Sequence, residues 1–247
     1  MKTLVLFVSL IASQVVAQFP AGQYFSLFGE KAAIITLDET SLLLKGGNPI
    51  FDAARKTITL DSAEDGQKVT VVKVHSTNNA NWRMIGKVDE STRTVFAIID
   101  IIRVDPNTLE LNFNKDEYQT AEEAEAHLKD SGGAFGFRLI TPAKVEQLMS
   151  LRPVKEMTPK DMVSIIGATD DTMAVLQKRY EGQPELAFFI MMIRPAQIVM
   201  DEIAARGYNP LVSRTEMDAV MEKLSEDPEV KKAKEASEGK ASEGHTE

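Results

Sequence analysis

Residues 93–113, RTVFAIIDIIRVDPNTLELNF, form the most heavily apolar strand-like segment downstream of the N-terminal leader region. Between residues 95 and 104, apolar side chains occupy both alternating positions, which is typical of a strand in the middle of a layered structure. Residues 105–108 predict a tight turn in which Pro fixes φ. The alternation over residues 109–113 indicates a partner strand with one wet face. We therefore predict a central β-hairpin.

Further strand-like segments surround this hairpin. They lie at residues 32–37, 41–44, 56–60, 69–74, 82–88 and 135–140. A loop is predicted at residues 46–49, GGNP, and residues 18–30 are expected to form a short helix or turn that packs as a lid. About eight short strands at close spacing indicate an α+β fold, with an antiparallel β-sheet or small barrel over residues 18–140.

The second half of the chain has the pattern of helices. Thr-Pro pairs at residues 141–142 and 158–159 place Thr at the N-cap and Pro at the first helical position. The second of these helices is expected to end near Gly167, with Thr169 capping a new one. We predict a helical region over residues 141–226. Residues 227–247 have no apolar face and are predicted to form a disordered tail.

In strand count and in the form of its central hairpin, the segment from residue 32 to residue 140 resembles the lipocalin-like β-barrels. The resemblance rests on layout, because the G-x-W signature near the N-terminus of that family is absent and Trp82 lies in mid-chain. It implies a barrel wide enough for one small ligand. No site residue is carried over from the family.

The net charge and the N-terminal leader pattern limit which partners the chain is expected to bind and indicate where it is located. The formal net charge of −9 argues against nucleic acid, because nucleic-acid binding needs a basic surface. Residues 1–17 have the features of a secretory signal, with Lys2 before an apolar run and small residues before Gln18. We expect no membrane span in the mature chain. The lack of Cys and of N-glycosylation acceptors favours a bacterial protein exported to the periplasm or beyond.

Asp100 is the single residue that stands out most as a candidate for a catalytic or ligand-binding role. On the predicted strand it shares a face with Phe96 and Ile98, where burial would raise the pKa of a carboxyl and suit it to act as an acid, a base or a ligand anchor. The simpler interpretation, which we favour, is that a bulge turns Asp100 outward, or that it forms a structural ion pair with one of three nearby cations, Arg83, Arg93 or Arg103.

The remaining motifs favour a protein without a catalytic or metal site. The histidines His75, His127 and His245 lack metal-ligand neighbours at suitable spacing. A calcium-loop-like pattern starting at Asn112 has Glu117 where the turn needs Gly. We therefore expect no metal, no cofactor and no catalytic residue, and an enzyme is the least favoured class.

Nine of the eleven methionines lie from Met149 onward, in the predicted helices. Methionine fills irregular helical cores, which is the interpretation we favour, and it also lines adaptable apolar grooves. In the second case, Phe188 and Phe189 contribute to a groove between the sheet and the helices.

Three hypotheses for function follow. The first is an exported, non-enzymatic protein that holds a small apolar or amphipathic ligand in the β-rich domain, under the helices, and it predicts an apolar cavity. Its candidate ligand-binding residues are Trp82, Phe96, Ile98, Asp100, Phe188 and Phe189. The second is a structural or interaction protein whose Met-rich helices bind a protein partner; it predicts a filled barrel and an exposed apolar helical patch. The third is an enzyme that uses Asp100 with an arginine or His75 in a cleft.

Overall fold

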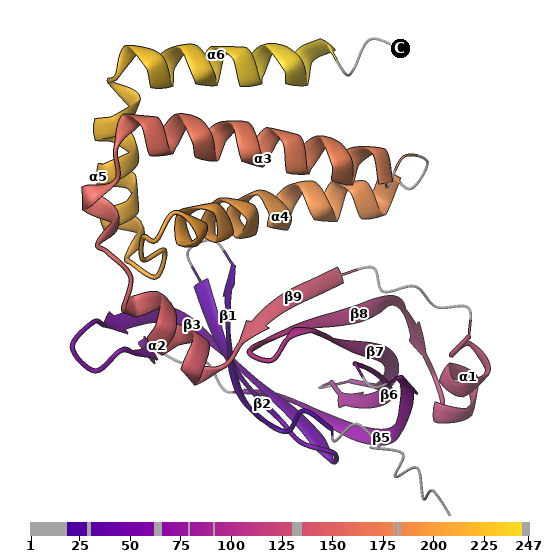
Figure 1. Ribbon diagram of the computed structural model, residues 1–247. Coiled ribbons are helices and arrows are strands. Elements are labelled where there is room, and N and C mark those ends of the chain that lie inside the picture. The colour runs from indigo at the N-terminus through magenta and orange to yellow at the C-terminus, as the bar shows by residue number, and fades with distance from the viewer. Residues whose placement is uncertain are drawn as a thin grey trace, which may run out of the picture.

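The computed structural model describes residues 19–28, 31–61, 66–78, 80–90, 92–129, 135–179, 181 and 184–243 (Figure 1). Within these ranges, the side chains of residues 28, 76–78, 115, 135, 184–193 and 238–243 are not described. The predicted signal segment, residues 1–17, lies outside the described residues.

Eight of the described strands close into an antiparallel barrel, so the predicted α+β fold is confirmed. In chain order they are β1 (Gly22–Phe28), β2 (Lys31–Leu37), β3 (Ser41–Asp52), β5 (Gln67–Asn78), β6 (Asn81–Asp89), β7 (Thr94–Asp105), β8 (Thr108–Tyr118) and β9 (Phe135–Ile140). Each strand pairs with its neighbour in this order, and the ring closes where Phe25 of β1 meets Ile140 of β9. The ninth strand, β4 (Thr57–Asp61), pairs only with the second half of β3.

The predicted central hairpin is confirmed as β7 and β8. The turn between them is held by Asp105, whose Oδ1 accepts a hydrogen bond of 2.7 Å from the backbone N–H of Asn107. Two predictions in the first half are wrong. Residues 46–49 are not a loop, because β3 continues through them as it changes partner from β2 to β4. Residues 22–28 form strand β1 in place of the predicted helix or turn, and their register with β2 completes the barrel.

Among the described residues, side chains fill the middle of the barrel interior. Met84, Ile99, Ile101 and Leu111 have no exposed surface, so no water-sized space lies beside them. Trp82 also points inward: the ring of Phe19 packs edge-on against it at 6.4 Å, and the guanidinium of Arg103 lies 5.0 Å from its ring centre. This packing explains why strand β7 is apolar on its inner face. On its outer face, Phe96 and Ile98 are packed under α1 (Ala121–Ala126), whereas Val104 is exposed.

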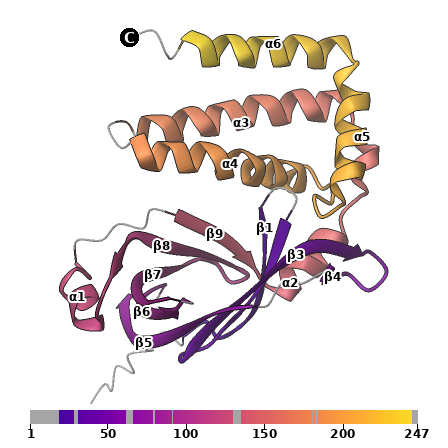
Figure 2. The same cartoon turned by 180° about the vertical axis from the view of Figure 1, so that it is seen from behind.

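The remaining helices follow β9. They are α2 (Pro142–Met149), the short 3₁₀ helix η1 (Val154–Glu156), α3 (Pro159–Arg179), α4 (Pro184–Ala205), α5 (Arg214–Ser225) and α6 (Pro228–Glu243). Of these, α4, α3 and α6 stack on one side of the barrel, and α2 lies beside its strands (Figures 1 and 2). Both views place α4 between the barrel and α3, with α6 on the far side of α3 and α5 crossing at one end. No helix among the described residues has the length and apolar character needed to cross a membrane.

The helix starts predicted at the Thr-Pro pairs are confirmed, whereas two other predictions are wrong. The hydroxyl of Thr141 accepts from the backbone N–H of Lys144 and caps α2. α3, however, runs without a break through Gly167 and Thr169, so Thr169 does not begin a new helix. The predicted disordered tail is replaced over residues 228–243 by α6, because Val230 is fully buried against α3 and Asp227 caps the helix at the N–H of Glu229.

Candidate functional site

Asp100 lies on the outer face of the barrel and is engaged in an ion pair. Its Oδ1 is 2.6 Å from Nε of Arg83, and its Oδ2 is 3.0 Å from Nη2 of the same guanidinium. Nη1 of Arg83 donates to the backbone oxygen of Leu128, beyond the end of α1. An ion pair with Arg83 was one of the structural alternatives considered from the sequence, and in the structure it connects β6, β7 and the segment after α1 to one another.

The six candidate ligand-binding residues do not line one cavity. Phe96 and Ile98 lie on the outer face with Asp100, packed under α1 beside Tyr118. Trp82 lies on the other side of the barrel wall, in the filled interior. Phe188 and Phe189 belong to helix α4, but their side chains fall outside the described part of the chain.

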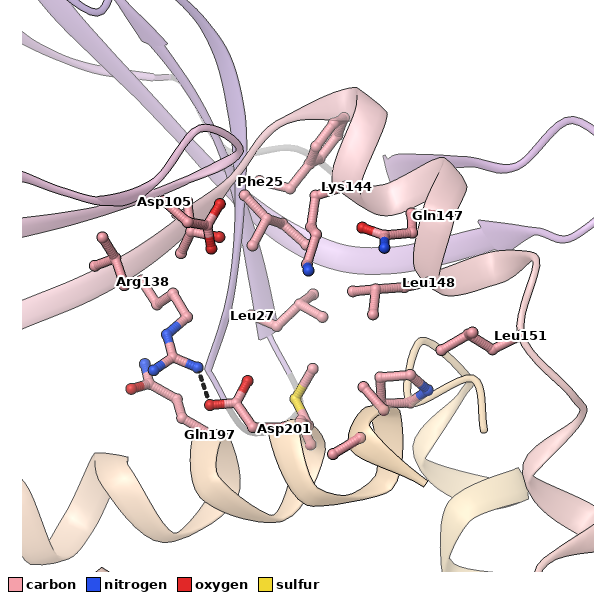
Figure 3. Close-up of a pocket in the computed structure, with 17 residues that line it drawn as sticks. Phe25, Leu27, Asp105, Arg138, Lys144, Gln147, Leu148, Leu151, Gln197 and Asp201 are labelled. Carbon is pink, nitrogen blue, oxygen red and sulfur yellow. Dashed lines mark hydrogen bonds and ion pairs between the residues drawn. The ribbon is translucent and has the colours of Figure 1, made fainter. Parts of the chain in front are cut away.

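The structure instead shows a cavity of about 440 Å³ between the outer wall of the barrel and the helices (Figure 3). β1 and β9 form its barrel side, α2 its roof and α4 its floor as drawn. Much of its lining is apolar. These side chains come from β1, β9, α2, the residue Leu151 just after α2, and α4: Phe25, Leu27, Ile140, Leu148, Leu151 and Met200.

Polar side chains gather on the other side of this cavity. Nη1 of Arg138 forms an ion pair with Oδ2 of Asp201, joining β9 to α4. Gln197 is almost fully buried beside this pair. Figure 3 shows Asp105, Arg138, Gln197 and Asp201 on one side, opposite Leu148, Leu151 and Gln147. The cavity is therefore amphipathic, with one charged end and one uncharged, mostly apolar end.

Lys144 lies between the two ends, and its ammonium points toward the middle of the cavity, above Leu27 (Figure 3). Within the described residues, this ammonium has no hydrogen-bond or salt-bridge partner, and it acts on Asp105 through charge alone. Burial tends to raise the pKa of Asp105. That effect is outweighed by hydrogen bonds from Asn107 and Thr108 and by the charges of Lys144 and Arg138, which together leave the pKa of this carboxyl below its usual value.

Simple local rules bring these side chains to one place. Alternation along β9 turns Leu139 into the barrel and Arg138 and Ile140 outward, toward the helices. On α4, Gln197, Met200, Asp201 and Ala204 follow the i, i+3, i+4, i+7 spacing of one helix face. The Thr-Pro start of α2 sets the position of Lys144 three residues after the cap.

A second, larger groove of about 720 Å³ lies next to this cavity, between α4, α5 and β3. Three methionines line it, Met200, Met217 and Met221, together with Val199, Ile203 and Phe51. Met200 and Leu27 line both this groove and the amphipathic cavity. The Met-rich helical surface considered from the sequence therefore exists as a concave apolar surface.

Histidine and carboxylate side chains do not assemble a metal site in the described part of the chain. His75 lies beside Arg83 on the outer wall, and Nε2 of His75 is buried with no partner among the described residues. The ring of His127 stacks on Tyr118 at 5.4 Å. His245 lies outside the described residues.

Sequence reasoning missed the residues of the amphipathic cavity. Leu27, Asp105, Arg138, Lys144 and Asp201 are far apart in the chain, and none lies in a motif that indicates a binding site. The available signals were indirect: a basic residue alternating with apolar ones in β9, and a polar stripe in an otherwise apolar α4. Comparison with protein-family models, with curated proteins and with solved structures finds no match to this chain.

Proposed function

We propose that this protein is a non-enzymatic binding protein that holds a small amphipathic molecule between its barrel and its helices. The observation that supports the proposal most directly is the cavity of about 440 Å³, whose size falls in the range of about 300–1,000 Å³ that is usual for small-molecule sites. Such sites are mostly apolar with a few placed polar groups. The cavity has this composition.

The location of the ligand differs from the one expected inside the β-rich domain. Side chains without exposed surface, including Met84 and Ile99, occupy the barrel interior. The outer wall at the β1–β9 closure offers apolar residues such as Phe25 and Leu27, and α2 and α4 cover them. In this proposal the barrel is a rigid wall and the helices complete the site.

Export to the periplasm or beyond is part of the proposal. It is supported by the leader-like residues 1–17 and by the absence of Cys. Expression of the full chain in a bacterial host, followed by fractionation and N-terminal sequencing, tests it. Cleavage before Gln18 is the expected result, and an uncleaved cytoplasmic chain would contradict export.

Binding is tested with N-phenyl-1-naphthylamine, a neutral probe whose fluorescence rises in apolar sites. The wild-type protein should bind the probe, and Ala204→Trp should weaken binding by roughly tenfold or more, because the added ring occupies the cavity. Ala174→Trp is the matched control, since Ala174 is exposed on α3 and does not line the cavity. Equal probe affinity in wild type and Ala204→Trp would refute binding in this cavity.

The Met-lined groove supports a second candidate, the docking of apolar side chains from a protein partner. Its volume of about 720 Å³ and its flexible methionines suit an adaptable surface. Native mass spectrometry of the protein isolated from its source separates the two candidates. A co-purifying small molecule supports ligand binding, and a stoichiometric polypeptide supports the docking of a partner.

A further inference from the structure

We infer that the ligand of the amphipathic cavity is a single-chain molecule with one negatively charged head group, and that Lys144 is the residue that recognises the charge. This inference rests on the proposed function. The cavity favours this head-group charge among molecules that have an apolar chain and fit its volume.

The first step is the separation of polar and apolar lining. The charged residues lie together at the Arg138 end, and Leu148, Leu151 and the uncharged Gln147 lie at the other (Figure 3). A ligand that is apolar throughout would remove water from the charged end and offer no new polar contact in return, which is costly. A molecule with a polar head and an apolar body matches both ends.

The second step is that the acidic groups of the cavity already have partners. The carboxyl of Asp105 accepts from the N–H of Asn107 at 2.7 Å, and its lowered pKa shows that its environment favours the charged form. Asp201 is bound by Arg138. A cationic head group would have to compete for these carboxylates and would be repelled by Lys144 and Arg138.

The third step is that Lys144 retains free donors. Arg138 is paired with Asp201 through Nη1, whereas its Nε is shielded from solvent and has no hydrogen-bond partner among the described residues. The Lys144 ammonium carries three N–H donors and has no hydrogen-bond or salt-bridge partner in the described residues, yet it points into the cavity (Figure 3). A charge-assisted hydrogen bond to an anion is the strongest contact available to it.

The fourth step concerns the number of charges. Lys144 and Arg138 are balanced by Asp105 and Asp201, so the four groups sum to zero. A single negative charge can pair with Lys144 while the other pairs stay intact. A doubly charged group such as a phosphate monoester would place its second negative charge near Asp105 and Asp201, with no second free cation to pair with it. A carboxylate-type head group is therefore favoured.

The test uses displacement of N-phenyl-1-naphthylamine from the full chain at neutral pH by decanoate, decanol and decylamine. These probes have the same chain length and differ in head-group charge. Decanoate should displace the probe at roughly tenfold lower concentration than decanol or decylamine, the ratio expected when one charge-assisted hydrogen bond is gained. Equal displacement by decanoate and decanol, or stronger displacement by decylamine, would overturn the inference.

Two variants locate the effect. Lys144→Met keeps the apolar stem and removes the charge, so decanoate affinity should fall to that of decanol, with decanol unchanged. Asp201→Asn removes a half-exposed counter-charge, so decanoate affinity should rise. Lys155→Met, at an exposed position away from the cavity, is the matched control and should bind all three probes as wild type does.

Failure of this inference is distinguishable from failure of the proposed function. If the naphthylamine probe does not respond to Ala204→Trp, the cavity is not a binding site and neither statement holds. If the probe responds to Ala204→Trp but decanoate affinity is the same in wild type and Lys144→Met, the cavity binds ligands and Lys144 does not select an anion.

Discussion

Arg83 and Asp100 join strands β6 and β7 through two contacts on the outer wall of the barrel, 2.6 Å from Nε to Oδ1 and 3.0 Å from Nη2 to Oδ2. Both side chains are largely shielded, with exposed fractions of 21% and 16%. A bidentate, partly desolvated pair of this kind contributes more than a pair on the open surface. The pair also orients Arg83 toward the backbone oxygen of Leu128, so it holds the segment after α1 in place.

Asp100→Asn should therefore lower stability without affecting ligand binding. Removing one partner leaves the Arg83 charge half-buried, and we expect a loss of about 2 kcal/mol, between the values for surface and buried pairs. Urea denaturation measures the loss, and naphthylamine binding to the folded variant should equal that of wild type.

Asp218→Asn is the control for this prediction, because Asp218 pairs with Arg214 while both side chains are more than half exposed. Its effect on the free energy of unfolding should stay within about 0.5 kcal/mol. A folded Asp100→Asn protein that loses probe binding would show that Asp100 belongs to a binding site after all.

Gly86 is a sensitive test of the filled barrel interior. A Cβ at this position would lie 2.5 Å from Cγ1 of Val69 and 2.9 Å from Cδ1 of Ile99, both in the interior. Gly86→Ala should thus destabilise the protein by about 1–3 kcal/mol through overpacking. Gly46→Ala in β3 is the control, since no atom lies within 4 Å of its added Cβ. Equal stabilities of the two variants, measured by thermal unfolding, would indicate an interior with free space.

Tyr208 links the start of α3 to the loop after α4. Its hydroxyl donates to Oδ2 of Asp161 at 2.8 Å, and the hydroxyl of Thr158 donates to the same oxygen at 2.6 Å. The hydrogen bond from the Thr158 hydroxyl is the main reason that the pKa of Asp161 is lowered. The Tyr208 hydroxyl and the charge of Arg152 lower this pKa further, whereas burial raises it. Tyr208→Phe should cost about 1 kcal/mol at neutral pH.

The cost of Tyr208→Phe should depend on pH in a defined direction. The pKa of Asp161 is lowered by folding, so its interactions stabilise the protein above the unfolded value of about 4 and are lost as pH falls through the lower folded value. The difference between wild type and Tyr208→Phe should therefore shrink on acidification below about pH 4. Tyr118→Phe is the control: its hydroxyl meets only the neutral amide of Asn114, at 3.4 Å, among the partners described, so no such trend is expected. A constant difference for Tyr208→Phe would refute the role of Asp161.

The local elements were predictable because they depend on short-range rules. Alternation identified β7 and β8, and Thr followed by Pro identified the starts of α2 and α3. What the sequence could not show was which face of β7 points inward. The inner face is apolar because it lines the barrel interior, and on the outer face Phe96 and Ile98 are apolar because α1 packs on them. Asp100 lies on this outer face.

The cavity could not be predicted from the sequence for a related reason. It depends on how α4 docks on the closure between β1 and β9, and this brings Arg138 and Asp201, 63 positions apart, into contact. No local pattern encodes such a docking geometry. The binding hypothesis anticipated an apolar site covered by helices, but not its place outside the barrel.

α6 shows how a single residue can decide between a tail and a helix. Its composition is polar, yet Val230 is fully buried among the side chains of α3 and α5, and the hydroxyl of Ser237 donates to Oδ1 of Asp170 at 2.7 Å. Val230→Ala should therefore lower the free energy of unfolding by about 2 kcal/mol, because it removes two packed methyl groups.

Val175→Ala provides the same chemical change at an exposed position, since Val175 on α3 is 60% exposed. Alanine favours helix more than valine does, so this variant should be neutral or slightly stabilised, within about 0.5 kcal/mol. Circular dichroism should also show that truncation after Asp227 removes helical signal that residues 228–243 supply in the full chain. Two results together would contradict this account: equal stability of the two Val→Ala variants, and an unchanged helical signal on truncation. They would mean that α6 does not pack on α3 in solution and that the C-terminal segment is the disordered tail that its composition indicates.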